Sequence, residues 1–89
     1  MRIKFAKKFS KQYDKAGHNI RVTVDERIKL FLENPFHPLL NNHRLSGKLT
    51  GWRSINITGD WRAIYSEYDE GGDKVVVFEI LGTHSQLYK

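Results

Sequence analysis

Residues 60–83, DWRAIYSEYDEGGDKVVVFEILGT, decide the fold class of this chain. Two runs rich in β-branched and aromatic residues, 61–68 and 74–81, flank the segment EGGD, whose glycines are typical of a tight hairpin turn. This pattern predicts two antiparallel strands. The preceding segment RLSGKLTGWRSINI (44–57) is also β-rich, and Thr58-Gly59-Asp60 separates it from the first run. The second half of the chain therefore predicts an antiparallel meander.

The first half of the chain predicts mainly helices. Residues 2–5 alternate as a short strand does, and apolar residues then recur at helical spacing to Ala16, with Gly17 as the expected stop. The apolar residues at 20, 22 and 24 also alternate as in a strand, but a 3.6-residue period continues from 20 to 32. The longer pattern favours a helix over 19–33, and the proline- and asparagine-rich segment 34–43 predicts a loop.

These elements define an α+β domain. A chain of 89 residues has room for one core, so residues 1–89 form a single domain. We expect a short N-terminal strand and two helices packed on one face of a curved antiparallel β-sheet. Because two helices cover only one face, the other face of the sheet is open for function.

Composition excludes several kinds of site. The chain contains no cysteine, which removes disulfides, thiolate nucleophiles and cysteine-based zinc sites and fits a reducing cytoplasm. The four histidines lack the spacing of a metal site, so neither a metal nor a cofactor is expected. No apolar run has the length of a signal peptide or a membrane span, and we expect a soluble, cytoplasmic protein without a membrane partner.

The formal net charge of +5 is unevenly distributed. Residues 1–24 hold seven lysines and arginines against one acid, and residues 44–62 are also basic, with Lys48 and Arg53 among their cations. A basic surface attracts polyanions such as nucleic acid, anionic lipid or an acidic protein. The alternative interpretation of the N-terminal lysines is a solvated helix face.

Arg62 is the first candidate for chemistry. Strand alternation places Arg62 on the side opposite Trp61 and Tyr65. If the aromatic side faces the helices, Arg62 lies on the open face of the sheet, where a guanidinium can bind phosphate through two hydrogen bonds. A cross-strand ion pair with Glu79 is the structural alternative.

The histidines are the other candidates. His43, in the loop before the sheet, and His84, after the last strand, can each transfer a proton near neutral pH. Gly82 allows a sharp bend that would bring His84 over the open face, and Tyr88 could stack on a base there. The alternatives are a surface histidine and a frayed terminus. Trp52 and Trp61 are typical of core or sheet packing.

Two histidines and an arginine are the groups that RNA cleavage without a metal requires. One histidine removes the proton of the ribose 2′-hydroxyl, the second protonates the leaving 5′-oxygen, and the cation stabilises the crowded phosphorane. The composition permits this mechanism without selecting it.

The order of short motifs in the chain carries a family resemblance. The motifs are His43-Arg44-Leu45-Ser46-Gly47, Gly51-Trp52-Arg53, Asp60-Trp61-Arg62-Ala63-Ile64-Tyr65 and Gly82-Thr83-His84-Ser85-Gln86-Leu87-Tyr88. Together they resemble the RelE/ParE superfamily of toxins from type II toxin–antitoxin systems, and within it the YafQ-like branch most closely. The segment GTHSQLY after a β-meander is the most distinctive of them.

This resemblance implies a fold, an activity and partners. The fold would be the RelE-like microbial ribonuclease fold. The activity would be a ribosome-dependent endoribonuclease (mRNA interferase) that cuts mRNA in the ribosomal A site without a metal and is neutralised by a cognate antitoxin. By resemblance, His84 is the general acid, His43 the general base and Arg62 the phosphate-binding residue. The expected substrate-binding residues are Tyr88, Asp60, Trp61, Arg53 and Lys48.

Two positions depart from the YafQ-like pattern. Ile80 stands where YafQ-like proteins can carry an arginine, and Asn56 stands where they can carry a histidine. Arg62 would then supply the missing positive charge. The alternative functions are a ParE-like toxin that acts on DNA gyrase and a non-catalytic relative that binds RNA or protein. Neither alternative needs the proton-transferring histidines.

Overall fold

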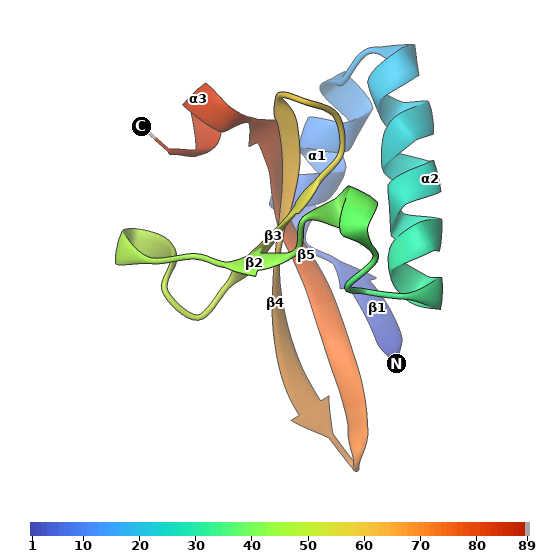
Figure 1. Ribbon diagram of the computed structural model, residues 1–89, viewed down its shortest axis with the longest axis vertical. Helices are drawn as coiled ribbons and strands as arrows, with labels where there is room; N and C mark the ends of the chain where they lie inside the picture. The colour runs from blue at the N-terminus through green and yellow to red at the C-terminus, as the bar shows by residue number, and fades with distance from the viewer. Residues whose placement is uncertain (89) are drawn as a thin grey trace.

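The structure, a computed structural model, describes residues 1–88 and forms a five-stranded sheet with its two longer helices on one face (Figure 1). The elements in chain order are β1 (Arg2–Phe5), α1 (Lys7–Lys15), α2 (His18–Glu33), the 3₁₀ helix η1 (Pro38–Leu40), β2 (His43–Arg44), the 3₁₀ helix η2 (Gly47–Leu49), β3 (Arg53–Asn56), β4 (Trp61–Glu70), β5 (Asp73–Thr83) and α3 (His84–Leu87). None of the helices in this part of the chain is long and apolar enough to cross a membrane.

The sheet confirms the predicted α+β class. Its strand order is β1-β5-β4-β3-β2, and the strands from β2 to β5 pair antiparallel. The N-terminal strand β1 pairs parallel with β5, with Arg2 opposite Val75 and Phe5 opposite Phe78. The antiparallel prediction therefore holds for four strands, and β1 adds a parallel edge that makes β5 a central strand.

The hairpin and the second helix form where the sequence predicts them. Gly71 and Gly72 form the β4–β5 turn with φ of 59° and 83°, a left-handed conformation at both positions that suits glycine. Helix α2 covers His18–Glu33, so the strand alternative for residues 20–24 is wrong. A continuous helix buries Val24 and Phe31 on one face.

Three local expectations need correction. Of the β-rich segment 44–57, only Arg44 and residues 53–56 lie in strands, because η2 interrupts the segment. There Gly47 has a φ of 66°, and the Thr50 hydroxyl donates to the Gly47 carbonyl over 2.7 Å. Helix α1 does end at Lys15, just before the predicted stop at Gly17, but Gly17 has a φ of −63° and is the N-cap of α2, so the stop is not a left-handed glycine. The expected loop 34–43 contains η1.

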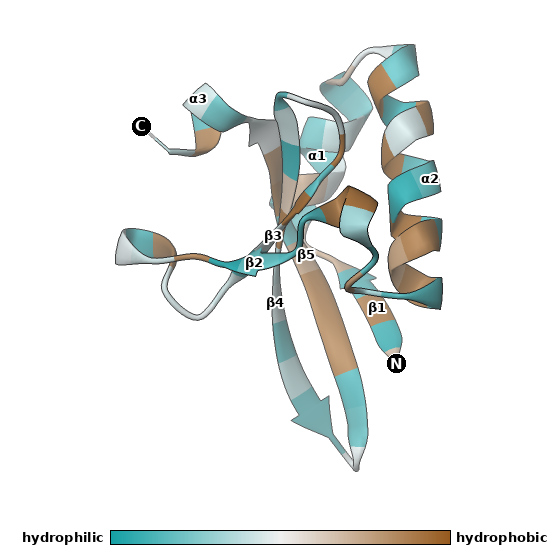
Figure 2. Cartoon of the chain, in the orientation of Figure 1, coloured by the Kyte–Doolittle hydropathy of each residue, from teal (hydrophilic) through white to brown (hydrophobic). Residues whose placement is uncertain are grey.

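The core lies between the sheet and the helices α1 and α2. Three rings meet at its centre: Phe31 and Phe78 lie 5.5 Å apart edge to face, and Tyr65 lies 5.0 Å from Phe31. Figure 2 shows the hydrophobic run along β5 that contributes to this core. The remaining buried members are Phe9, Val24, Leu40, Ile55, Ile57, Ala63, Val76 and Leu81. Burial raises the pKa of the Tyr65 hydroxyl.

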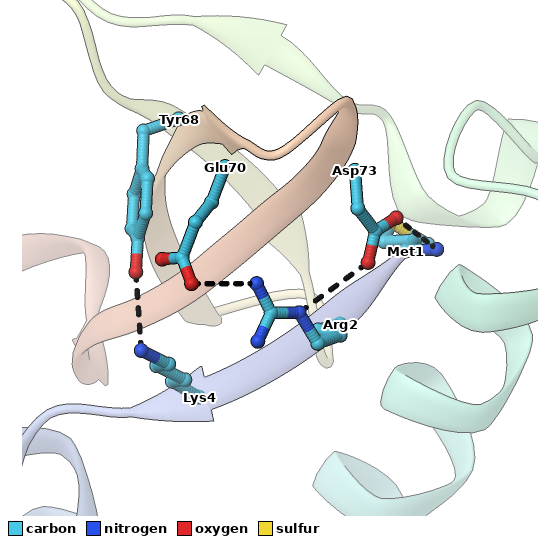
Figure 3. A network of polar contacts seen from close by, with 6 residues as sticks. All are labelled: Met1, Arg2, Lys4, Tyr68, Glu70 and Asp73. Atoms are coloured by element: carbon cyan, nitrogen blue, oxygen red, sulfur yellow. Dashed lines mark hydrogen bonds and ion pairs between the residues drawn. The ribbon is translucent and has the colours of Figure 1, made fainter.

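The far end of the β4–β5 hairpin is held to β1 by charged side chains (Figure 3). Arg2 contacts Glu70 over 3.0 Å and Asp73 over 3.3 Å, and the Met1 amino group contacts Asp73 over 3.1 Å. Lys4 donates to the Tyr68 hydroxyl over 3.1 Å. These exposed contacts join the parallel strand to the hairpin tip.

Candidate active site

The opposite end of the sheet contains a shallow depression where β2, β4 and α3 meet. Its volume is about 360 Å³, and its lining consists of Asn41, His43, Arg44, Leu45, Ser46, Arg62, His84 and Tyr88. The fold thus brings together all three predicted catalytic residues and Tyr88, which lie far apart in the sequence.

His84 is held by a helix, which excludes the interpretation of residues 84–88 as a frayed terminus. The Thr83 hydroxyl accepts a hydrogen bond from the Gln86 backbone N–H, and the Gln86 side-chain oxygen accepts one from the Thr83 N–H over 2.9 Å. This capping box starts α3 directly after β5. In addition, the His84 N–H donates to the Asp60 carbonyl over 2.9 Å, which ties the start of α3 to the loop before β4.

Gly82 serves a different purpose from the predicted bend. It lies inside β5, directly opposite Arg62 in the ladder, and its φ is not positive. A Cβ atom at this position would lie 3.1 Å from Oε1 of Gln86 and 3.2 Å from Cδ2 of Leu87. A side chain at this position would crowd Gln86 and Leu87, because α3 begins directly after Thr83 and packs closely against the strand.

The rings of His84, the first residue of α3, and Tyr88, its C-cap, lie side by side, with centroids 4.7 Å apart and planes inclined by 50°. Both side chains are exposed, and the Tyr88 N–H donates to the His84 carbonyl over 3.1 Å. An exposed aromatic ring next to an imidazole offers a stacking surface for a base beside a proton-transferring group.

Arg62 lies half-buried in the depression and is oriented by backbone groups. Its Nη1 atom donates to the carbonyls of Thr58, over 2.9 Å, and Trp61, over 3.1 Å. The alternative ion pair with Glu79 does not form, since Glu79 instead accepts a hydrogen bond of 2.6 Å from the Ser66 hydroxyl. Within residues 1–88, Nε and Nη2 of Arg62 make no hydrogen bond, and both remain available to an anion.

His43 enters the depression from the other side, on the two-residue strand β2. It pairs with Ser54 of β3, and its side chain is exposed. Its Nδ1 atom lies 2.8 Å from the carbonyl oxygen of Asn41. One nitrogen of the imidazole is therefore held by the backbone, and the other makes no hydrogen bond to the described residues.

Four predicted substrate-binding residues lie outside the lining of the depression. Asp60 contributes its backbone carbonyl to α3, and Trp61 packs partly buried against the core. Arg53 donates to the Asn42 side chain over 2.8 Å and lies 5.3 Å from the Phe36 ring. Lys48 is exposed on η2. Contact with substrate stays a prediction for these side chains.

Arg44 and Asn41 also line the depression, although neither was predicted as a site residue. Arg44 follows His43 in β2, is exposed, and forms no ion pair with any residue from 1 to 88. It adds a second cation to the lining, beside Arg62. Its position next to His43 in a basic segment was the available signal.

The groove between α1 and α2 offers a different set of groups. It contains carboxylates from Asp14 and Asp25 but no histidine among its lining residues. The pKa of Tyr13 in this groove is raised, because its hydroxyl donates to Asp25 over 2.8 Å. In the part of the chain that the structure describes, no group of three or more histidine, aspartate or glutamate side chains could hold a metal ion.

Comparison with known proteins identifies the family. The whole chain, residues 1–89, matches the family described as bacterial toxin of type II toxin–antitoxin system, YafQ. The chain belongs to the YafQ toxin family. No curated protein matches the chain in sequence. The predicted resemblance to YafQ-like toxins is thereby confirmed.

Solved structures of related toxins share the fold. YafQ from E. coli strain BL21(DE3) is 25% identical, with all of both chains covered and a TM-score of 0.74. The YoeB/ParE toxin from Agrobacterium tumefaciens is 18% identical, with 94% of this chain and 99% of that chain covered and a TM-score of 0.76. The E. coli DinJ–YafQ toxin–antitoxin complex contains a chain that is 25% identical, with 98% and 96% covered and a TM-score of 0.64.

Proposed function

We propose that this YafQ-family toxin is a ribosome-dependent endoribonuclease that cleaves mRNA by acid–base catalysis without a metal. The observation that carries the proposal is the shared depression, which gathers two histidines and an arginine from β2, β4 and α3. RNA cleavage moves the phosphorus from the 5′-oxygen of one ribose to the 2′-oxygen of its neighbour. Two proton-transferring groups and a cation are the groups that this reaction requires.

The reaction would begin at the ribose 2′-hydroxyl. His43 accepts the 2′-proton while the 2′-oxygen forms a bond to phosphorus, and His84 donates a proton to the 5′-oxygen as its bond to phosphorus breaks. The products are a 2′,3′-cyclic phosphate, which water can open to a 3′-phosphate, and a 5′-hydroxyl. Each proton transfer typically contributes ~10²–10⁴-fold to the rate.

Arg62 would hold the phosphate during this exchange. Two nitrogens of its guanidinium make no hydrogen bond to residues 1–88, and the side chain lies in the same depression as both histidines. Ile80, at the position where YafQ-like proteins can carry an arginine, precedes Gly82 by two residues on β5, and Gly82 faces Arg62 across the ladder. We infer that this chain carries the phosphate-binding cation on β4 in place of β5.

The neighbouring residues would position the RNA. Tyr88 offers a ring for base stacking beside His84, and Arg44 offers a second contact for the RNA backbone. Asp60, Trp61, Arg53 and Lys48 surround this end of the sheet, where a longer substrate would extend. The toxin would act on translating ribosomes in the cytoplasm.

A cognate antitoxin would neutralise the toxin. The support is the solved complex of the similar E. coli YafQ with DinJ. The net charge of +5 favours a partner with an acidic contact surface.

The test compares the wild-type protein with His84→Ala after induction in bacteria, following growth and mapping mRNA 5′ ends by primer extension. We expect growth arrest with new cuts inside translated codons for the wild type and neither for His84→Ala. Arrest by both proteins without new RNA ends would instead support a gyrase-directed toxin. No arrest by either protein would indicate a non-catalytic binding relative.

A second assay tests the metal-free mechanism. The purified toxin alone is first treated with EDTA, and the magnesium that the programmed ribosomes need is then restored. Treated and untreated toxin should cleave the ribosome-bound mRNA at the same rate. Loss of activity after this treatment would contradict the metal-free chemistry.

A further inference from the structure

We propose that Asn41 is a positioning residue that fixes the tautomer of His43 and so makes Nε2 the atom that accepts the proton. The catalytic consequence rests on the proposed ribonuclease function, whereas the tautomer itself is a property of the free protein. Asn41 lines the same depression but acts through its backbone carbonyl.

The contact between Asn41 and His43 assigns the proton. A backbone carbonyl can only accept a hydrogen bond, so Nδ1 of His43, 2.8 Å from the Asn41 oxygen, must carry the hydrogen. In the neutral ring Nε2 then holds the lone pair. Nε2 makes no hydrogen bond to residues 1–88, which leaves it available to a hydroxyl group of the substrate.

The backbone of Asn41 is what aims this carbonyl. Asn41 has φ 44° and ψ 49° and is the only non-glycine residue with a positive φ within residues 1–88. Asparagine tolerates this left-handed conformation better than most residues, and β-branched residues tolerate it poorly. The conformation ends η1, where the Asn41 N–H donates to the Pro38 carbonyl over 3.2 Å.

The residues on both sides of Asn41 hold the carbonyl in place. Leu40 is completely buried in the core. Asn42 donates to the Pro35 carbonyl over 2.9 Å and to the Tyr65 hydroxyl over 2.8 Å, and it accepts a hydrogen bond from Arg53 over 2.8 Å. With both neighbours fixed, the orientation of the Asn41 carbonyl depends on its own φ and ψ.

His37 provides an internal reference of the opposite kind. Its Nδ1 atom accepts a hydrogen bond of 3.1 Å from the Leu39 N–H, so its neutral ring must carry the hydrogen on Nε2. Two histidines in one short segment are therefore assigned opposite tautomers by backbone groups. A measurement that distinguishes the tautomers has its control within the same molecule.

The experiment records two-bond ¹H–¹⁵N correlation spectra of ¹⁵N-histidine-labelled protein at a pH where the imidazoles are neutral. Replacing His43 and His37 singly by glutamine assigns their signals. We expect the Nδ1–H pattern for His43 and the Nε2–H pattern for His37 in the wild-type protein. An Nε2–H or averaged pattern at His43 would overturn the proposal without any variant of Asn41.

Variants of Asn41 then separate backbone conformation from side-chain chemistry. Asn41→Gly keeps access to the left-handed conformation and should retain the Nδ1–H pattern of His43. Asn41→Val should lose the Nδ1–H pattern and cleave about 10- to 100-fold more slowly. Asn41→Ala provides the same comparison with a milder change if the valine variant does not fold.

The two measurements separate the possible failures. An unchanged Nδ1–H pattern in both Asn41→Val and Asn41→Ala would overturn the role of Asn41. Equal cleavage by variants that lose the pattern would overturn its catalytic consequence. If the wild type shows the expected pattern but cleaves no mRNA on ribosomes, the proposed function fails while the tautomer assignment stands.

Discussion

The two ends of the β4–β5 ladder differ in whether their charged side chains form ion pairs. At the hairpin tip, Arg2, Glu70 and Asp73 are joined in ion pairs (Figure 3). At the other end, beside α3, Arg62 and Arg44 form no ion pair with any residue from 1 to 88. The same sheet therefore carries a neutralised end and a cationic end.

This difference distinguishes a structural use of charge from a binding use. A paired side chain already has its hydrogen-bond partners, and exposed pairs add little to stability. An unpaired guanidinium with free N–H groups attracts an anion instead. The lysines of α1 are also exposed and form no ion pair with residues 1–88, but no histidine lines the surface around them. The combination of free cations with histidines marks the site more clearly than the number of basic residues.

The largest expected effect comes from removing the free guanidinium. Arg62→Ala should lower the rate of ribosome-dependent mRNA cleavage by ~10²–10³-fold, because the developing charge on the phosphate loses its stabilising group. Arg62→Lys should recover part of the loss, since it restores the charge without the two-pronged hydrogen bonding. Single-turnover cleavage rates provide the measurement. Equal rates for wild type and Arg62→Ala would contradict the proposal that the unpaired arginine at this end of the sheet serves binding.

A smaller loss of cleavage rate is expected when the packing of α3, which positions His84, is disturbed. Gly82→Ala places a methyl group against Gln86 and Leu87, which should weaken the capping box and slow cleavage about tenfold. Gly59→Ala is the matched control, since a Cβ there has nothing within 4 Å. The same cleavage assay applies to both variants. A loss in Gly59→Ala as large as that in Gly82→Ala would show that close packing is not the cause.

The contact between the core and the loop before β2 should have a moderate effect on stability. Tyr65→Phe removes the hydroxyl that accepts from Asn42 and should lower the free energy of unfolding by about 1 kcal/mol, measured by urea denaturation. Asn42 keeps its bond to the Pro35 carbonyl, so the loop should remain in place. An unchanged free energy of unfolding would mean that water replaces this contact without cost.

The smallest effect is expected at the hairpin tip, and it depends on pH. The hydrogen bond from Arg2 lowers the pKa of Glu70, and the Met1 amino group, with Arg2, lowers that of Asp73. Lowered carboxyl pKa values stabilise the fold fully above their ordinary values of about 4, and this stabilisation is lost as the pH falls through the folded-state values. Arg2→Gln should therefore lower Tm slightly at pH 6 and much less at pH 3.

The tip variant also tests the functional contrast. Arg2→Gln should cleave mRNA at the wild-type rate near neutral pH, because the tip lies at the far end of the ladder from His84. A tenfold loss of cleavage would show that the paired end contributes to function and would remove the distinction between the two ends.

The sequence predicted those parts of the fold that depend on local patterns. The period of residues 20–32 predicted α2, and the glycine pair predicted the β4–β5 turn. The parallel pairing of β1 with β5 could not be predicted, because it joins residues 2–5 to residues 75–78 and leaves no local signal. The same holds for the close packing at Gly82, which arises only when α3 lies against the strand.

The candidate site shows the same division. The sequence motifs predicted four site residues, His43, Arg62, His84 and Tyr88, and the fold places all four in one depression. Sequence reasoning could not identify the role of Asn41, because its backbone conformation and its distance from the His43 ring exist only in three dimensions.

The central position of β5 has a consequence for synthesis on the ribosome. Residues 2–5 are made early, yet their partners in the sheet, residues 75–78, are among the later ones, and β4 also needs β5 beside it. Pairing over such sequence separations is slow and must wait for the later segment to emerge. His84 directly follows β5, so the same stretch completes both the sheet and the cluster of histidines. A nascent chain that lacks it therefore has neither the complete sheet nor the depression that we propose as the active site.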